Sequence, residues 1–192
     1  LVLGGAGFIG RTLIPRLDAA GHRITVPTRR RERARPLVLL PKTDVVECDI
    51  QDDATLERLL AGQTVVINLV GLLHGRPGQP DDPFGPDFRK AHVTLMERLV
   101  RLMSAQRVPR LIQVSALGVP DGDPATAPSR YLRSKAAAEQ LIRESALDWT
   151  IFRPSVVFGP GDSFLTLFAG LQRLLPVMMV AHADARFQPV YA

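Results

Sequence analysis

Leu1–Gly10 reads LVLGGAGFIG, an apolar run that leads directly into three glycines spaced three residues apart. The run is typical of a buried strand, and the glycines are typical of the tight turn from a strand into a helix. One glycine permits the bend, one lets backbone N–H groups approach a ligand, and one lets the helix pack on the strand. Because a helix N-terminus presents unpaired N–H donors, this junction predicts a site for a dinucleotide pyrophosphate. The residues predicted to form it are Gly4, Gly7, Phe8, Ile9 and Gly10.

Strand-like and helix-like patterns alternate along the rest of the chain. The strand-like runs lie at 1–3, 23–28, 44–48, 64–69, 110–115 and 149–153. A helix is predicted from Phe8, with Gly21 as its C-terminal cap and Pro15 as an expected kink. Further helical patterns lie at 52–60, 87–105, 130–145 and 164–174. Strands separated by helices imply right-handed crossovers, so we predict an α/β fold, a Rossmann-type doubly wound parallel sheet with helices on both faces.

The length of 192 residues is sufficient for one domain with a substantial core. We expect a dinucleotide-binding domain at 1–160 and the start of a small substrate or partner region at 161–192. The chain begins inside a strand-like run and ends in another, so we expect the natural protein to extend further at its C-terminus.

The composition narrows the class of protein. The single Cys48 excludes an intrachain disulfide framework, and no Cys/His spacing suggests zinc, so we expect no metal and a reducing, cytoplasmic compartment. The most apolar stretch, 164–181, is interrupted by Gln172, Arg173 and Pro176 and is too polar for a membrane span. It remains compatible with a peripheral position on the inner face of a membrane, or on a partner.

The end of the second strand favours one dinucleotide over the other. An NAD site usually has a carboxylate there, whereas arginine accommodates a 2′-phosphate. The chain has Thr28 followed by Arg29, Arg30 and Arg31, so NADP(H) is favoured over NAD(H), with Arg29 and Arg30 as the binding residues. The alternatives are a solvated basic loop and, given the sequence pI near 10.1, a nucleic-acid patch. Because no aromatic residues interleave the arginines, we do not expect a nucleic-acid partner.

Two more strand ends are candidates for the cofactor groove, since ligands of open α/β sheets bind at the carboxyl ends of strands. Asp49 and Ile50 follow the third strand, where the carboxylate could accept from an adenine amine. Leu69, Val70 and Gly71 follow the fourth, where a small residue lets the backbone approach the cofactor. The alternatives are a helix cap or turn role for the aspartate and simple turn chemistry for the glycine.

The catalytic candidates are Tyr131, Lys135 and Ser115. Tyrosine and lysine four residues apart share a helix face, so the ammonium of Lys135 is expected to lower the pKa of the phenol. Such a phenol can act as a general acid or base beside a carbonyl. Lys135 could also donate to the ribose hydroxyls, and Ser115, at the end of the fifth strand, could donate to the same carbonyl.

Together, the glycine turn, Ser115, the Tyr131-x-x-x-Lys135 pair and the segment FRPSVVFGPG at 152–161 resemble the extended or atypical short-chain dehydrogenase/reductases. This group includes nucleoside-diphosphate-sugar epimerases and dehydratases. The resemblance implies that the serine, tyrosine and lysine form a catalytic triad. It also implies that Pro154, Ser155 and Val156 line the nicotinamide.

Within this family, YLRSK at 131–135 and the run 162–165 are most similar to the branch of the NADPH-binding accessory subunit of respiratory complex I and its bacterial relatives. That similarity implies a nucleotide held for structure rather than turned over. Two functions are therefore expected. The first is an NADP-dependent oxidoreductase or epimerase of unknown substrate, and the second is a non-catalytic structural or assembly subunit docked on a membrane complex.

The chain departs from the sugar-epimerase pattern at several positions, and these departures weaken the inference of a nucleotide-sugar substrate more than the inference of cofactor binding. Only fifteen residues separate Ser115 from Tyr131, and His92 stands where an active-site asparagine is common. We interpret His92 as a helix-packing or solvent-facing residue and His74 as a loop residue. The Gly- and Pro-rich loop that starts at His74 is expected to border the substrate. The family's usual dimer would use the helices at 87–105 and 130–145.

Overall fold

The computed structural model describes residues 1–162, 170, 172–173 and 188–192. The chain divides into two units, Leu1–Arg153 and Pro154–Ala192, which are considered separately. In the second unit, β7 (Val157–Phe158) pairs in parallel with β8 (Val190–Tyr191). The predicted helix at 164–174 and the apolar stretch 164–181 lie almost entirely outside the described residues. Within the described part of the chain, none of the helices has the length and apolarity needed to cross a bilayer.

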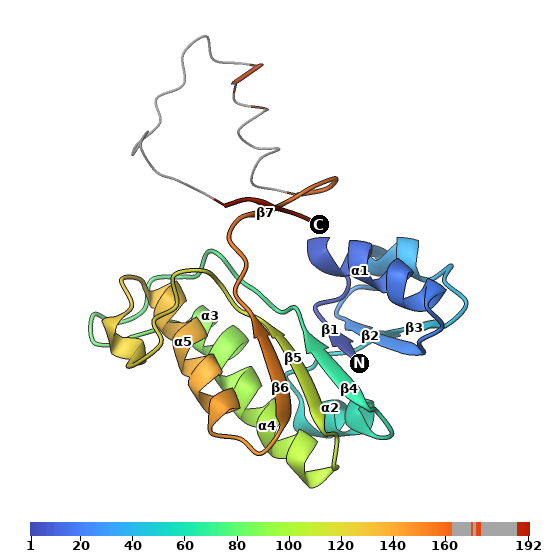
Figure 1. Ribbon diagram of the computed structural model, residues 1–192, viewed down its shortest axis with the longest axis horizontal. Coiled ribbons are helices and arrows are strands. Elements are labelled where there is room, and N and C mark those ends of the chain that lie inside the picture. The colour runs from blue at the N-terminus through green and yellow to red at the C-terminus, as the bar shows by residue number, and fades with distance from the viewer. Residues whose placement is uncertain (163–169, 171, 174–187) are drawn as a thin grey trace. The chain divides into compact units, whose positions relative to one another are not determined.

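The first unit is built on parallel strands (Figure 1). Four of them pair in the order β1-β4-β5-β6, and β2 pairs with β3 beside β1. Their bounds are β1 Val2–Leu3, β2 Ile24–Thr28, β3 Thr43–Glu47, β4 Val65–Asn68, β5 Arg110–Val114 and β6 Asp148–Phe152. The two sets together run 3-2-1-4-5-6, which confirms the predicted doubly wound parallel fold.

Helices connect these strands close to the predicted positions. They are α1 Phe8–Ala19, the 3₁₀ helix η1 Arg31–Leu37, α2 Asp53–Leu60, α3 Pro86–Phe88, the π-helix η2 Arg89–Thr94, α4 Leu95–Ala105, the 3₁₀ helix η3 Pro124–Thr126 and α5 Arg130–Arg143. Pro15 lies inside α1, which continues to Ala19 although proline cannot donate to the preceding turn. Gly21, with φ +95°, donates to Asp18 while His22 donates to Leu17. These two bonds form a Schellman motif, so the predicted glycine terminates this helix.

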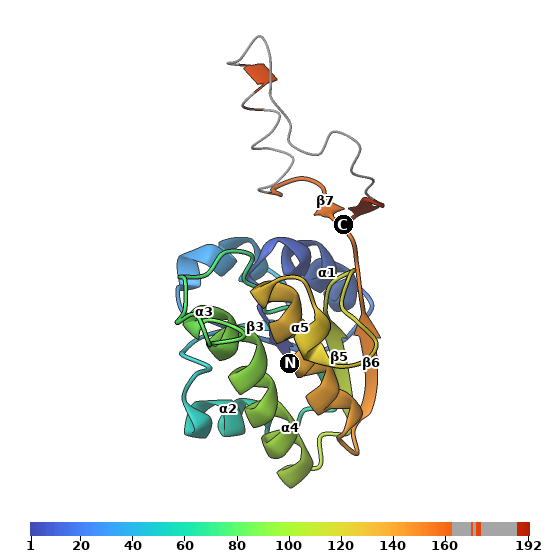
Figure 2. The same ribbon diagram turned by 90° about the vertical axis from the view of Figure 1, so that its left-hand side faces the viewer.

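Alternation along the strands produces two apolar layers, one on each face of the sheet. Leu1 and Leu3 point to one face, where α2, α4 and α5 cover them, whereas Val2 points to the other, beneath α1 and η1. Figure 2 shows α4 and α5 together in front of the sheet. The helices predicted on both faces are therefore present. This arrangement leaves the carboxyl ends of the strands free to form a binding edge.

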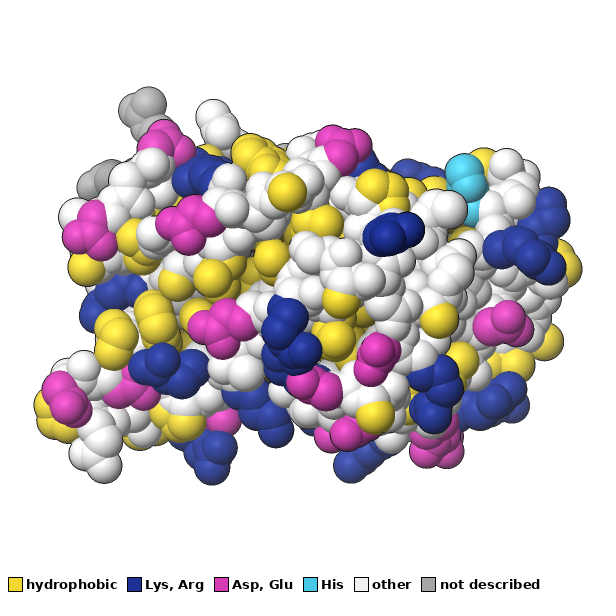
Figure 3. Space-filling model, turned by 90° about the horizontal axis from the view of Figure 1, so that it is seen from below, with side chains coloured by type: hydrophobic (Ala, Val, Ile, Leu, Met, Phe, Trp, Pro, Cys, Tyr) yellow, Lys and Arg dark blue, Asp and Glu magenta, His cyan; other side chains and the backbone are white. Residues whose placement is uncertain are grey.

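Charged side chains of both signs are mixed on the face shown in Figure 3. The net charge of +5 is therefore not concentrated into a continuous basic stripe on that face. The basic run that follows β2 lies instead at the carboxyl edge of the sheet, beside a pocket.

Candidate dinucleotide-binding and catalytic site

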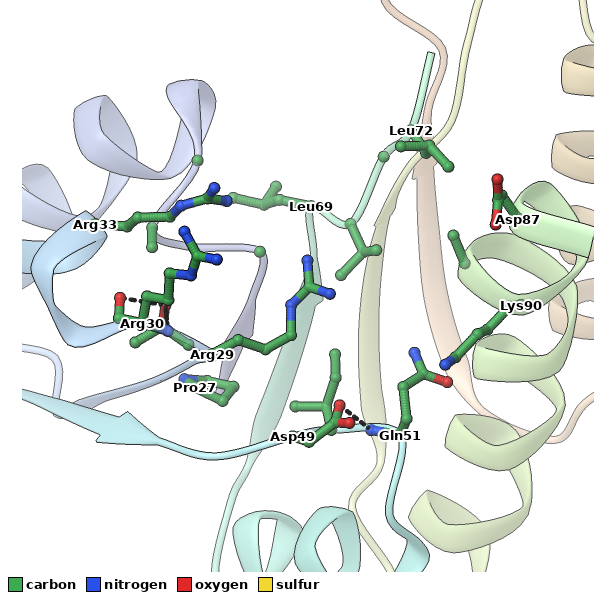
Figure 4. Close-up of a pocket in the computed structure, with 18 of the residues that line it drawn as sticks. Pro27, Arg29, Arg30, Arg33, Asp49, Gln51, Leu69, Leu72, Asp87 and Lys90 are labelled. Atoms are coloured by element: carbon green, nitrogen blue, oxygen red, sulfur yellow. Dashed lines mark hydrogen bonds between the residues drawn. The ribbon is translucent and has the colours of Figure 1, made fainter. Parts of the chain in front are cut away.

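A pocket of about 850 Å³ lies in the first unit at the carboxyl edge of the strands (Figure 4). Its lining includes the turn after β1 and segments 27–30, 48–51 and 69–72, at the carboxyl ends of β2, β3 and β4. The other lining residues are Arg33, His74, Arg76, Asp87, Lys90 and Ala91. The predicted residues that line it are Gly4, Gly7, Arg29, Arg30, Asp49, Ile50, Leu69, Val70 and Gly71. Among the predicted residues of the first unit, those outside this lining are Phe8, Ile9, Gly10, Ser115, Tyr131 and Lys135.

The glycines of the first turn are required by close backbone contacts. Gly4 has φ +73°, and a Cβ there would lie 2.8 Å from the carbonyl carbon of Leu69. A Cβ on Gly10 would lie 2.1 Å from the carbonyl oxygen of Gly5, so Gly10 serves the packing of α1 on the turn. Gly7 is the N-cap of α1 and supplies no side-chain cap. The first N–H groups of α1 are therefore available to an anion.

Three arginines lie together on one side of the pocket. Figure 4 shows Arg29, Arg30 and Arg33 there, and their side chains form no ion pair with the described residues. Arg31 is engaged elsewhere, because its guanidinium donates to the Val45 carbonyl at 3.4 Å. The sequence interpretation missed Arg33 as a site residue. No periodic pattern in the sequence marked it, because Arg33 is positioned by the 3₁₀ helix η1, where residues three apart eclipse each other.

The local geometry tests the structural roles considered for two strand-end residues, a helix cap or turn for Asp49 and a turn for Gly71. The N-cap of α2 is Asp52, whose carboxylate accepts from the Thr55 N–H at 2.7 Å. Asp49 is exposed at the pocket and accepts from the Gln51 N–H at 3.0 Å, a turn interaction. Gly71 has no left-handed φ, and a Cβ there would meet nothing closer than the Leu69 carbonyl oxygen at 4.0 Å. Neither the turn nor the packing of the described residues therefore requires glycine at position 71.

Ser115 and Lys135 lie in the interior beside the end of β5. The hydroxyl of Ser115 has no hydrogen-bond partner among the described residues. The Nζ atom of Lys135 donates to the carbonyls of Val114 at 3.2 Å and Val70 at 3.5 Å. Burial lowers the pKa of Lys135 to about 8, and the charge of Glu139 opposes this shift. The amine is thus held by backbone oxygens at the ends of two neighbouring strands.

The expected effect of Lys135 on Tyr131 is not found. Burial raises the pKa of the Tyr131 phenol above its usual value. Among the described residues, no hydrogen bond joins Tyr131 to Lys135, whose amine binds backbone carbonyls instead. The prediction of a lowered phenol pKa in this state was therefore wrong, because desolvation dominates and the lysine charge is directed elsewhere.

Tyr131 lies in an aromatic cluster that includes His92. The rings of Phe88 and His92 stack at 5.8 Å, and the ring of Tyr131 lies 5.7 Å from His92 and 5.9 Å from Phe88. His92 is buried, in agreement with the interpretation as a packing residue, whereas His74 is exposed in the loop and lines the pocket. Burial and the nearby Lys135 lower the pKa of His92 to about 3.

A buried ion-pair network is centred on Glu139, two turns after Tyr131 on α5. The Glu139 side chain is 1% exposed and accepts from Arg153 at 2.7 Å and from Arg143 at 2.9 Å. Arg153 also pairs with Asp121 at 2.7 Å. The network ties α5 to the chain that leaves β6. The next residues, Pro154, Ser155 and Val156, belong to the second unit, so the pocket is described without them.

The sequence matches the family described as NAD(P)H-binding over residues 4–161. The chain is 31% identical to the NADH dehydrogenase [ubiquinone] 1 alpha subcomplex subunit 9 of Arabidopsis thaliana, covering 99% of this chain and 46% of that protein. It is also 31% identical to the ceramide reductase of Caulobacter vibrioides, covering 99% of this chain and 56% of that protein. The chain thus spans about half the length of the curated relatives it matches.

Among solved structures, the fold is similar to that of dTDP-glucose 4,6-dehydratase from Streptomyces venezuelae with NAD bound. The TM-score is 0.77 at 21% identity, covering 99% of this chain and 67% of that chain. A second similar structure is MoeE5 with UDP-glucuronic acid and NAD, with a TM-score of 0.67 at 26% identity over 86% of this chain and 58% of that one. The first likeness supports the fold alone, and both neighbours hold a dinucleotide.

Proposed function

The chain belongs to the NAD(P)H-binding family, among the extended short-chain dehydrogenase/reductase-like proteins, and we propose that it binds NADP(H) and acts as a carbonyl oxidoreductase or epimerase. The observation that carries this proposal is the pocket itself. The start of α1, which has no side-chain cap, lines one part of this pocket. Arg29, Arg30 and Arg33 line another part, and they have no acidic partner among the described residues.

The residues of the pocket are suited to the phosphate groups of a dinucleotide. The first turn of α1 and Gly7 would hold the pyrophosphate through backbone N–H groups. Arg29, Arg30 and Arg33 would bind the 2′-phosphate, because a guanidinium matches phosphate oxygens bidentately. Gly71 would let the backbone approach the cofactor, which gives a reason for glycine at a position where no contact in the described chain requires it.

The proposed chemistry depends on Tyr131, Ser115 and Lys135, which lie outside the pocket lining, with Lys135 bonded to the carbonyl of the lining residue Val70. When bound, the nicotinamide supplies or accepts a hydride. Tyr131 exchanges a proton with the substrate oxygen, and Ser115 donates a hydrogen bond to the same oxygen. The unpartnered hydroxyl of Ser115 supports this role, since a buried polar group without a partner is destabilising until a ligand satisfies it. Lys135 would donate to the ribose hydroxyls.

Nucleotide titration tests the cofactor assignment. Removing one charged hydrogen bond to the phosphate should weaken NADPH binding by about 10- to 100-fold in Arg29→Ala and Arg30→Ala, with little effect on NADH. Arg35→Ala is the matched control, because it removes the same charge from the exposed helix η1 that follows these residues, outside the pocket lining. Equal affinities for both dinucleotides, unaffected by these substitutions, would refute the phosphate site.

A second candidate function is a subunit that holds NADPH without turning it over and docks peripherally on a membrane complex. The raised pKa of Tyr131 favours it, because such a phenol is poorly matched to proton exchange near neutral pH. The Arabidopsis relative is named as a subunit of NADH dehydrogenase.

Mass spectrometry of nucleotide retained after native purification distinguishes the two functions. A tightly held, non-exchanging NADPH, with co-purifying membrane subunits and no turnover of carbonyls or nucleotide sugars, would favour the subunit. Turnover that is lost in Tyr131→Phe while NADPH affinity is kept would establish the enzyme. Turnover unchanged by that substitution would remove Tyr131 from the mechanism.

A further inference from the structure

His92 lies on a segment of irregular helical geometry. The π-helix Arg89–Thr94 separates α3 from α4, and His92 within it is 4% exposed. Such widened turns are rare and are frequent at functional sites. The ring contacts Phe88 and Tyr131, so its plane is restrained from two directions. A buried imidazole must also satisfy both of its nitrogens.

The hydrogen bonds of His92 determine its tautomer. Its Nε2 atom lies 3.3 Å from the backbone N of Leu72, which can only donate, so Nε2 is the acceptor. In a neutral ring Nδ1 then carries the proton, and it lies 2.8 Å from the hydroxyl of Ser134. That hydroxyl donates its own hydrogen to the Tyr131 carbonyl at 2.7 Å. The bonds therefore run in one direction from His92 to the backbone of the tyrosine.

The Leu72 bond acts on a segment beyond the backbone ladder of the sheet, where the Asn68 side chain also accepts from the Val70 N–H at 3.1 Å. β4 ends at Asn68, and the last ladder bond beside it is the one from the Leu69 N–H to Leu3 at 2.9 Å. Beyond that point, Lys135 donates to the carbonyl of Val70 and His92 accepts from the N–H of Leu72. The backbone is thus held on both sides of Gly71, which itself makes no close packing contact among the described residues.

We infer that His92 is a positioning residue, which as the Nδ1–H tautomer fixes the segment Val70–Leu72 against the Tyr131 turn of α5. Through this link the wall of the pocket and the candidate catalytic tyrosine keep one relative position. The role in nucleotide binding rests on the proposed function. The tautomer and the Leu72 bond do not, since both belong to the free protein.

The tautomer is tested directly by ¹⁵N NMR of the histidine ring in the free protein at pH 7. The expected result is a neutral His92 ring with the proton on Nδ1. A ring with the proton on Nε2, or a charged ring, would overturn the inference whether or not the protein binds a nucleotide.

Two substitutions test the positioning role. His92→Phe keeps an aromatic ring but has no acceptor, whereas the side-chain oxygen of His92→Gln can take the position of Nε2. In His92→Phe we expect the Leu72 amide to exchange with solvent about ten-fold faster and NADPH to bind about ten-fold more weakly. In His92→Gln, the Leu72 exchange rate and the NADPH affinity should both return most of the way to their wild-type values. The Leu69 amide, held by the ladder, is the internal control and should not change.

The outcomes separate this inference from the proposed function. Unchanged Leu72 exchange and unchanged NADPH affinity in a folded His92→Phe protein would overturn the positioning role. If the unmodified protein does not bind NADPH, the proposed function fails, and the tautomer and the Leu72 exchange rate still decide the inference.

Discussion

Replacing His92 by Gln should remove a pH-dependent part of the stability. Burial and the charge of Lys135 lower the pKa of His92 from 6.5 to about 3 in the folded protein. Because the folded-state pKa is the lower one, this contribution is present above pH 6.5 and is lost as the pH falls toward 3. At pH 5, protonation of this histidine raises the statistical weight of the unfolded state by a factor of about 30. The free energy of unfolding of the wild type should therefore be about 2 kcal/mol lower at pH 5 than at pH 7.

Urea unfolding at pH 7 and pH 5 measures this loss. Glutamine does not titrate, so the loss between the two pH values should be smaller in His92→Gln by about 2 kcal/mol. Lys135, with a pKa of about 8, is charged at both pH values and does not alter the comparison. His22→Gln, at an exposed turn, is the control and should behave as wild type. If His92→Gln loses as much stability as wild type, the imidazole is not held neutral and the reasoning is refuted.

Three further predictions concern stability and are measured by urea unfolding. Gly4→Ala should destabilise the protein by about 1–3 kcal/mol, because position 4 has a left-handed backbone and lies against the backbone of Leu69. Gly122→Ala, with open space around it, should be nearly neutral, and equal effects would contradict this. Glu139→Gln should cost about 1.5–3 kcal/mol, because Arg153 loses a buried carboxylate, and a loss below 0.5 kcal/mol is the contrary result. Asp52→Ala should lower the urea midpoint by uncapping α2, and an unchanged midpoint would exclude that cap.

The sequence contained enough information for the sheet and its binding edge. The run from Leu1 to Gly10 predicts a strand, a turn and a helix because each step depends on local chemistry, and the later alternation predicts parallel order. Strand ends such as Asp49 and Gly71 could be assigned to the pocket for the same reason. In an open parallel sheet, the carboxyl ends of successive strands meet at one edge.

The remainder depends on geometry that a regular period does not describe. Arg33 reaches the pocket because η1 is a 3₁₀ helix, and His92 faces the interior from a π-helix, where the 3.6-residue period does not apply. The spacing of Tyr131 and Lys135 predicts a shared face but not the partner of the amine. Its partners are backbone carbonyls at the ends of the paired strands β4 and β5, which are distant from Lys135 in the sequence, and only the folded chain reveals them.

The central position of β1 has a consequence for how the protein is made. Val2 pairs with Ile67, which lies 65 residues further along the chain. At translation rates of about 5–20 residues per second, the first strand waits about 3 to 13 seconds before its partner has been synthesised. During that interval an apolar segment that later becomes the middle of the sheet has no β4 to pair with. Strand order therefore leaves this segment without its β4 partner for several seconds of synthesis, independent of any ligand.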